Sequence, residues 1–420
     1  MNELDIVILS NGPGEISTWV RPFVKSLAAE FSTNGLGVRI SVVLSPCPHS
    51  TGKEAHIALS YPEIDRVLPA SNFFSFLLWG KTKDSWQWHS QGVVIFLGGD
   101  QFYTLAIAKR LGYQSLVYAE WEARWYRYLD AYAVMNEKVA TKIPEKFQPK
   151  LTVVGDLIAD IALEVTESET INSNSSVIGL LPGSKSAKLM QGVPFCLAIA
   201  QKLQSLQPNL QFLIPVAPTL DLETIASYAQ PASNKLLPQC GNVSAELITQ
   251  NDGQHAYLLT SEGTKIDLIT EFPAYQKLLS CQLCVTTVGA NTAELGSLGI
   301  PMIVILPTQQ LDAMRSWDGI PGILANLPVI GSSFAKLINL IVLKQNRLFA
   351  WPNIWAKQEI VPELIGKLDP EKIAITVKDY LDHPEKLQLM SDRLIAVRGN
   401  SGAAQKIATI VHQLVQKNRS

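Results

Sequence analysis

The chain is poor in cysteine and in charge for its length, and it contains no long apolar segment. Its five cysteines among 420 residues are an odd number at scattered positions, which argues against a disulfide framework and for a reducing compartment. No apolar run approaches the ~18 residues that a membrane-spanning helix needs. The acidic start MNELD also lacks the basic region of a signal peptide. We therefore expect a cytoplasmic protein.

Basic stripes and metal-binding motifs are lacking as well. Lys and Arg total 35 and Asp and Glu total 37, so the net charge of −2 gives no pull toward nucleic acid, and we predict no such partner. Cys281 and Cys284 have CxxC spacing, but no second pair or nearby histidine completes a zinc site, and buried thiols are ordinary in an apolar run. We predict no metal site.

Short apolar runs, rich in β-branched residues, alternate with segments of helical period over most of the chain. Near-continuous apolarity is typical of parallel strands that are buried on both faces. The pattern therefore predicts an α/β protein with doubly wound, Rossmann-like sheets. The predicted strands are Asp5–Leu9, Val38–Leu44, Val93–Leu97, Ser115–Tyr118, Ala131–Val134, Val177–Leu181, Gln211–Val216, His255–Leu259, Leu283–Thr286 and Met302–Leu306.

A polar segment without periodicity, TESETINSNSS at 166–176, interrupts this alternation. A composition shift of this kind indicates a linker. We predict an N-terminal domain over 1–165 and a C-terminal domain over 177–400, facing each other across a cleft. In such sheets a ligand lies beyond the carboxyl ends of the strands.

The first predicted strand ends in the loop SNGPGEIS. Gly12 and Gly14 permit a sharp turn and the close approach of another molecule to the backbone. Glu15 then opens the first helix, where its carboxylate either contacts a ligand or complements the helix dipole.

The second domain opens with a strand that runs into Pro182-Gly183-Ser184-Lys185. Ser184 is predicted to cap the following helix, whose free N–H groups and positive dipole suit a phosphate, with Lys185 adding a point charge. The alternative is an ordinary turn between strand and helix. Further on, Glu294 lies near the start of a short helix, where it either accepts both hydroxyls of a ribose or complements the dipole.

Several motifs occur in one order along the chain. In the second half they are LLPGSK, the block Gly289–Leu295 with its following Gly-x-Pro strand, Pro352-Asn353-Ile354, VPELI and Asp369–Ile373; in the first half they are Gly14–Ser17, YAEWEARW at 118–125 and Val154–Asp160. This series resembles the lipid-A-disaccharide synthase family, inverting glycosyltransferases of the GT-B fold. The resemblance covers most of the chain.

The resemblance implies a nucleotide-sugar donor, most simply a UDP-sugar, held by the second domain as a co-substrate. Ser184 and Lys185 would lie at the diphosphate, Glu294 at the ribose and Asn353 close to the nucleotide. The donor-binding set implied by the matched blocks is Gly183, Ser184, Lys185, Gly289, Ala290, Asn291, Glu294 and Asn353. Such enzymes need no metal or other cofactor, because a helix N-terminus and basic side chains stabilise the leaving diphosphate.

The same resemblance places the acceptor in the first domain. Asp100 matches the aspartate of the family's Pro-Asp-Phe-Asn segment and is the first candidate for the catalytic base; Glu15 is the second. Asp100 is also a candidate N-cap for a helix over 102–111, and both roles can hold together. The implied acceptor-binding residues are Gly12, Gly14, Ser17, Trp121 and Arg124.

Departures from the family pattern cluster in the first domain. Thr18-Trp19 replaces a Gly-Asp pair, Gly99 stands in a proline position, and Asp156-Leu157 replaces the His-Pro of the hinge. These changes favour an acceptor other than a lipid A precursor. Two other functions stay open: a nucleotide-sugar epimerase, and a non-catalytic relative that binds nucleotide sugar or lipid.

The segment 72–81, NFFSFLLWGK, has almost no polar face. It is too short to span a bilayer, so it is either a buried helix or an exposed segment that enters the membrane interface, with a peripheral location on the inner face of a membrane. A lipid-linked or hydrophobic acceptor would explain an exposed apolar segment at the membrane interface. The final helix, 402–420, is expected to pack back on the first domain, as in the family.

Overall fold

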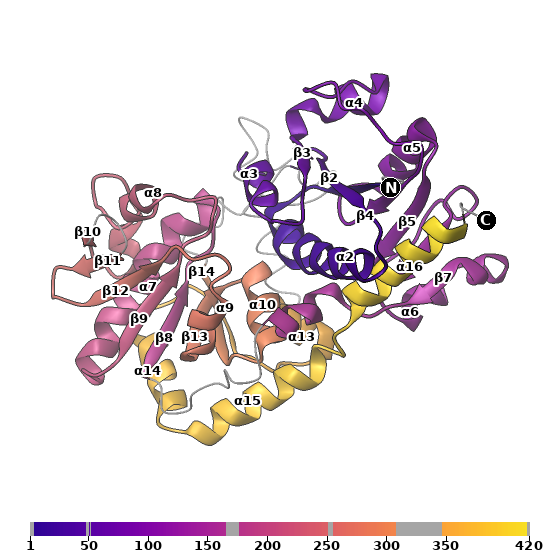
Figure 1. Ribbon diagram of the computed structural model, residues 1–420. Coiled ribbons are helices and arrows are strands. Elements are labelled where there is room, and N and C mark those ends of the chain that lie inside the picture. The colour runs from indigo at the N-terminus through magenta and orange to yellow at the C-terminus, as the bar shows by residue number, and fades with distance from the viewer. Residues whose placement is uncertain are drawn as a thin grey trace, which may run out of the picture. The chain divides into compact units, whose positions relative to one another are not determined.

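The computed structural model describes residues 4–47, 50, 52–164, 176–250, 255–307 and 347–417. The chain divides into two compact units (Figure 1): Met1–Glu164 together with Gly399–Ser420, and Val165–Arg398. Each unit contains one sheet, and each is described by itself. The linker predicted at 166–176 lies outside the described residues except for Ser176.

The first unit contains a seven-stranded, all-parallel sheet in the order β3-β2-β1-β4-β5-β6-β7. All seven residues of β1 are buried, as expected for a strand covered on both faces. The strand order reverses between β1 and β4, where ligands bind in sheets of this kind. The strands are β1 (Leu4–Ser10), β2 (Val38–Leu44), β3 (Arg66–Leu68), β4 (Gly92–Phe96), β5 (Gln114–Ala119), β6 (Ala131–Val134) and β7 (Leu151–Val153).

Helices fill the connections between these strands. The described ones are α1 (Pro13–Glu15), the π-helix η1 (Ile16–Val20), α2 (Arg21–Thr33), α3 (Glu54–Leu59), η2 (Ala70–Asn72), α4 (Phe73–Trp79), α5 (Gln101–Leu111), α6 (Glu137–Ala140), η3 (Glu145–Lys150), η4 (Leu157–Glu164) and the C-terminal α16 (Ala403–Lys417).

Helix α16 packs beside α2 in the first unit, although it comes from the end of the chain (Figure 1). The Asp160 carboxylate, which is 2% exposed, accepts hydrogen bonds from the backbone N–H groups of Gly402, Ala403 and Ala404. Burial raises the pKa of Asp160 more than these hydrogen bonds lower it. The aspartate of the matched 154–160 motif thus caps α16, which satisfies N–H groups that the helix itself cannot.

A buried network of charged groups lies at the amino-terminal edge of this sheet, near the start of β1. Asp5 on β1 is fully buried, and its carboxylate accepts two hydrogen bonds from the Arg39 guanidinium, at 2.7 and 3.0 Å. The backbone N–H of His89 and the Tyr113 hydroxyl each lie 2.7 Å from Asp5 Oδ2, and Arg66 Nη2 is 3.7 Å from Oδ1. The network ties β1, β2 and the loop before β4 together.

The second unit contains an eight-stranded sheet in the order β10-β11-β12-β9-β8-β13-β14-β15. The strands from β12 through β9 to β15 pair in parallel, whereas β10, β11 and β12 form antiparallel pairs. The strands are β8 (Val177–Leu181), β9 (Gln211–Pro215), β10 (Ala245–Gln250), β11 (His255–Thr260), β12 (Lys265–Ile269), β13 (Cys281–Thr287), β14 (Met302–Pro307) and β15 (Glu363–Gly366).

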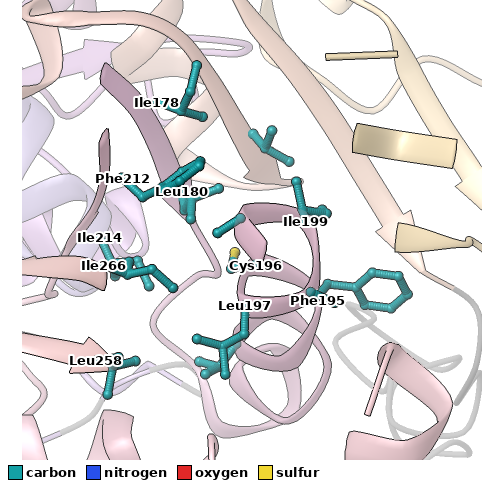
Figure 2. Close-up of a cluster of buried hydrophobic side chains, with 14 of the residues drawn as sticks. Ile178, Leu180, Phe195, Cys196, Leu197, Ile199, Phe212, Ile214, Leu258 and Ile266 are labelled. Atoms are coloured by element: carbon teal, nitrogen blue, oxygen red, sulfur yellow. The ribbon is translucent and has the colours of Figure 1, made fainter. Parts of the chain in front are cut away.

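The longest described helix of this unit, α7 (Ser186–Leu206), covers the sheet with its apolar side chains. The core of this unit includes Leu197 and Ile199 of α7, Leu180 of β8, Ile214 of β9 and Ile266 of β12 (Figure 2). The remaining described helices are α8 (Leu222–Ser227), η5 (Leu237–Cys240), α9 (Tyr275–Leu279), α10 (Ala290–Leu298), α13 (Trp351–Ala356), α14 (Pro370–Leu381) and α15 (Pro384–Val397).

The CxxC pair belongs to the core of this sheet. Cys281 and Cys284 lie on β13, are fully buried and form no disulfide. Gly179 on β8 faces them, and a Cβ atom at that position would lie 2.5 Å from Cys284 Sγ. The two thiols therefore pack against a glycine of the neighbouring strand.

Candidate functional site

In the first unit, the loops after β1 and β4 pack together at the carboxyl edge of the sheet. A Cβ atom at Gly12 would lie 2.3 Å from Glu15 Oε2, so glycine makes room for this carboxylate. Gly98 has φ +136°, and a Cβ atom there would lie 2.9 Å from Asn11 Oδ1 and 3.4 Å from Glu15 Cγ. A side chain at position 98 would be strained and crowded, so the glycine lets Glu15 approach the loop that carries Asp100.

Ser17, a predicted acceptor residue, and its neighbour Thr18 form hydrogen bonds with the backbone of the first loop. The Ser17 hydroxyl donates to the Pro13 carbonyl at 2.8 Å, and the Thr18 hydroxyl donates to the Gly14 carbonyl at 2.9 Å. These bonds support the tight first turns of the helical segment that presents Glu15. Gly12 and Gly14 shape this loop, and Glu15 is its ionisable side chain.

Asp100 follows β4 and is the N-cap of α5, as predicted. Its Oδ1 accepts a hydrogen bond of 2.8 Å from the Phe102 N–H. Its Oδ2 lies 3.7 Å from Arg124 Nη2, and the two side chains are 45% and 47% exposed. The structure therefore brings together Asp100 and Arg124, two predicted site residues that are 24 positions apart in sequence. An exposed ion pair of this kind is weak and leaves Oδ2 accessible to a ligand.

The loop after β5 carries Arg124 and is held in place by α5. Gln101 Nε2 donates to the Glu122 carbonyl at 2.9 Å, and Gln101 Oε1 accepts from the Arg124 N–H at 2.8 Å. Trp121, the other predicted acceptor residue of this loop, is 53% exposed. Part of its ring is therefore accessible to solvent.

Two carboxyl groups at this edge were not singled out as site residues by the sequence reasoning. Glu120 follows β5 and Asp156 follows β7. Burial, and then the charges of Asp156 and Glu15, raise the pKa of Glu120 to about 8, although a hydrogen bond from the Trp121 side chain opposes the rise. Burial raises the pKa of Asp156 to about 6. The sequence signals were that both residues lie in matched motifs, 118–125 and 154–160, and that each comes just after a strand.

In the second unit, the strand β8 runs into the predicted phosphate loop, but the cap differs from the prediction. Helix α7 begins at Ser186 with Lys185 as N-cap, and no side chain caps it; Ser184 was predicted to do so. A serine caps only from the residue directly before the helix, and that place belongs to Lys185. Gly183 has φ +97°, as a turn glycine requires. The first N–H groups of α7 therefore have no side-chain partner from the cap residue.

Lys188 is the basic side chain that turns from α7 into this loop region. Its Nζ donates to the Val288 carbonyl, beyond the end of β13. Both flanking glycines make room for it: a Cβ atom at Gly289 would lie 2.8 Å from Lys188 Nζ, and one at Gly183 would lie 3.1 Å from Lys188 Cδ. Burial, and then the charge of Lys185, lower the pKa of Lys188 to about 8.

The block 289–294 forms the start of α10, with Gly289 as its N-cap at φ +150°. Ala290 is exposed and Asn291 is partly exposed, which leaves both open to a ligand. Glu294 is partly buried, and burial raises its pKa to about 7. Within the described ranges, its carboxylate has no hydrogen bond or ion pair.

No family model matches the chain. The Lipid-A-disaccharide synthase of Geobacter metallireducens is 23% identical over 332 residues, which cover 74% of this chain and 72% of that protein. The protein of the same name from Geobacter sulfurreducens is 23% identical over 258 residues, which cover 60% of this chain and 53% of that protein. The chain is thus similar in sequence to lipid-A-disaccharide synthases at 23% identity. The match thus spans about half the length of the Geobacter sulfurreducens protein.

Two solved structures are similar to this chain over nearly its whole length. One is the UDP-GlcNAc 2-epimerase from Neisseria meningitidis bound to UDP-GlcNAc, with a TM-score of 0.50 and 15% identity over 98% of this chain and 100% of that one. The other is the S. aureus MnaA-UDP co-structure, with a TM-score of 0.50 and 13% identity over 100% and 97%. These likenesses confirm the predicted fold class, the two α/β sheets of GT-B proteins.

Asn353, which was predicted to lie close to the nucleotide, is instead buried in a hydrogen-bonded network of the second unit. Asn353 is fully buried, and its Nδ2 donates to the Val361 carbonyl and to Glu363 Oε1, at 2.9 and 2.7 Å. Its Oδ1 accepts from the N–H groups of Ile360 and Val361. The matched PNI and VPELI motifs are thus two halves of one hydrogen-bonded network. Asn353 has no exposed atom for a nucleotide, and its contribution is to hold the segment before β15.

Proposed function

We propose that this protein transfers a sugar from a nucleotide-sugar donor, a UDP-sugar, to a lipid-linked or hydrophobic acceptor. The observation that carries the proposal is the carboxyl edge of the second sheet. There, the N-terminus of α7 without a side-chain cap, two glycine turns and the Lys188 ammonium converge. The names of the curated relatives and the UDP-GlcNAc in the Neisseria structure support the same donor class.

The proposed reaction is a single displacement with inversion at the sugar. The acceptor hydroxyl oxygen attacks the anomeric carbon, its proton passes to the Asp100 carboxylate, and the bond from the anomeric carbon to the phosphate oxygen breaks. Negative charge grows on the leaving diphosphate, and the N–H groups of α7 and a lysine ammonium stabilise it without a metal ion. Glu15 remains the second candidate for the base.

Titration with UDP and UDP-sugars tests the donor assignment. A nucleotide that binds only the folded protein, at 100 times its Kd, stabilises it by about 2.7 kcal/mol. We expect UDP to raise the melting temperature by roughly 5 °C or more, and ADP and GDP to raise it less. Equal shifts for all three nucleotides, or none, would contradict the assignment.

An NMR measurement of the donor then separates transfer from the epimerase alternative, which the likeness to the Neisseria structure keeps open. With donor alone, a transferase leaves the sugar unchanged, whereas an epimerase converts it. With donor and a lipid extract, we expect release of UDP. A protein that binds donor but releases no UDP with any lipid fraction would be a non-catalytic relative.

Helix α4 supports a membrane-facing acceptor. Phe73 and Phe76 are buried in the first unit, whereas Phe74, Leu78 and Trp79 are 51%, 56% and 65% exposed. One face of this helix is therefore buried, and the other presents apolar side chains to solvent, as a membrane-interface segment would. None of the helices in the described ranges has the length and apolarity to cross a bilayer.

We expect the double variant Phe74→Asp and Trp79→Asp to co-sediment at least tenfold less with vesicles that contain anionic lipid. Each exposed ring buries apolar surface in the interface, at about 25 cal/mol per Å², and a charge there opposes burial. Ile375→Asp on α14, at a side chain that is 57% exposed, is the matched control and should sediment like the wild type. Equal sedimentation of all three proteins would remove α4 from the membrane proposal.

A further inference from the structure

The sequence points to Lys185 as the cation of the phosphate loop, and the structure brings a second lysine, Lys188, to the same loop. Lys188 extends from the first turn of α7 to the loop beyond β13, where its ammonium donates to the Val288 carbonyl. An ammonium has three donors, so two remain for a ligand after this bond. The hydrogen bond fixes the group beside Gly183 and Gly289, the two turns that leave the backbone open.

A buried hydroxyl provides a second, independent observation. Thr287, the last residue of β13, is 7% exposed, and its Oγ1 has no hydrogen-bond partner within the described ranges. Oγ1 lies 3.2 Å from the position of a Cβ atom at Gly183, so it points to the same turn as Lys188. A buried hydroxyl without a partner is unfavourable, and a bound ligand at this turn would provide the partner.

The N-terminus of α7 adds a third contribution at the same turn. This helix has 21 residues, and its N-cap, Lys185, provides no side-chain acceptor for the first N–H groups. Such N–H groups, with the positive end of the dipole, favour a phosphate. The hydroxyl lies at the end of β13, and the ammonium and the helix end belong to α7, which follows the neighbouring strand β8. The hydroxyl and the lysine side chain both lie beside Gly183.

We propose that Lys188 and Thr287 form the subsite for a phosphate of the donor's diphosphate, with Lys188 rather than Lys185 as its principal cation. This proposal rests on the nucleotide-sugar function and names the residues of that site. The ammonium donates to a phosphate oxygen while it keeps its bond to Val288, and the Thr287 hydroxyl donates to the same group. Charge-assisted hydrogen bonds of this kind are about twice as strong as neutral ones.

The subsite makes nucleotide binding depend on pH. Burial and the charge of Lys185 lower the pKa of Lys188 to about 8. Of the other titratable groups around it, Glu294 on α10 has its pKa raised to about 7 by burial alone, and the Tyr228 hydroxyl lies 2.9 Å from Ser186 Oγ. Because a phosphate favours the ammonium form, binding takes up a proton above pH 8, and affinity falls as Lys188 becomes neutral.

Isothermal titration with UDP tests the assignment. We expect Lys188→Gln to weaken UDP binding by at least about 30-fold and Thr287→Val by about fivefold, whereas Lys185→Gln has a smaller effect than Lys188→Gln. Lys202→Gln, also on α7 and paired with Glu371 at 3.3 Å, should bind UDP like the wild type. The ratio of the wild-type affinity to that of Lys188→Gln should fall about tenfold from pH 7 to pH 9.

The outcomes separate this proposal from the function on which it rests. If the wild type binds UDP and Lys188→Gln binds it equally well, the subsite is wrong and the nucleotide function stands. If Lys188→Gln does not fold, two other measurements decide the same question: the UDP affinity of Thr287→Val and the proton uptake of the wild type on UDP binding above pH 8. The subsite is wrong if Thr287→Val binds UDP like the wild type and the wild type takes up no proton. If the wild type binds no UDP, both proposals fail.

Discussion

Replacement of Asp100 by asparagine is expected to lower kcat by about 10²–10⁴-fold with little change in UDP affinity. This is the range that a positioned general base contributes. Asparagine caps a helix about as well as aspartate does, so the bond from the Phe102 N–H to position 100 and the stability of the protein should persist. Asp100→Ala should lose the same activity and, in addition, about 1 kcal/mol of stability, because the cap is lost.

The control for the cap is Asn136→Ala. Asn136 is the N-cap of α6 and accepts a hydrogen bond of 3.2 Å from the Val139 N–H, so this variant removes a cap from the same unit but no carboxylate. We expect Asn136→Ala to have the kcat of the wild type. If Asp100→Asn keeps the wild-type rate, Asp100 is only a cap, and Glu15→Gln becomes the variant to measure.

Asp5→Ala is expected to destabilise the first unit by about 3–5 kcal/mol, which is the usual cost of removing one partner from a buried ion pair. Without the carboxylate, the Arg39 and Arg66 guanidinium groups lose their buried anion. Arg66 cannot easily move away, since it lies 4.2 Å from the ring centroid of Trp86. Urea unfolding, followed by hydrogen exchange of the β1 amides, measures the loss. Asp84→Asn, at an exposed carboxylate nearby, should change stability by less than about 0.5 kcal/mol.

The same carboxylate predicts how stability depends on pH. Burial alone would raise the pKa of Asp5, but the hydrogen bonds from Arg39, His89 and Tyr113 outweigh it and hold the pKa below the ordinary value of 3.8. A folded pKa below the unfolded one gives stability that is present above about pH 4 and is lost as the pH falls through the folded value. The difference between wild type and Asp5→Ala should therefore shrink below pH 4. A constant difference down to pH 2 would contradict this account.

Long, continuously apolar strands could be predicted from the sequence, whereas short and edge strands could not. The predicted runs 38–44, 131–134 and 177–181 coincide with β2, β6 and β8. The strands β3 and β7 have three residues each, which is too short for periodicity to show. Strand β12 alternates polar and apolar residues, and the edge strand β10 mixes polar with apolar residues and is partly exposed, so neither forms the continuous apolar run that the prediction relied on.

The sequence allowed us to predict which loops form the candidate site, but not which of their side chains make the contacts. The glycine turns after β8 and β13 mark the carboxyl edge, but the contact of Lys188 with the Val288 carbonyl joins residues 100 positions apart, which no local pattern links. The start of α7 also differs by one residue from the prediction. The role of Asn353 depends on Glu363, ten residues later, which no local pattern links to it.

The cap that Asp160 provides for α16 has a consequence for synthesis on the ribosome. The N–H groups that donate to Asp160 belong to residues up to 244 positions later, so the first unit cannot acquire its last helix until the whole second unit has been translated. Until then the face of α2 that packs against α16 is exposed to solvent. In the folded protein, Glu30 Oε1 on this face lies 3.1 Å from His412 Nδ1. The nascent N-terminal half therefore presents an unfinished surface to chaperones throughout elongation, and it matures last, although it is made first.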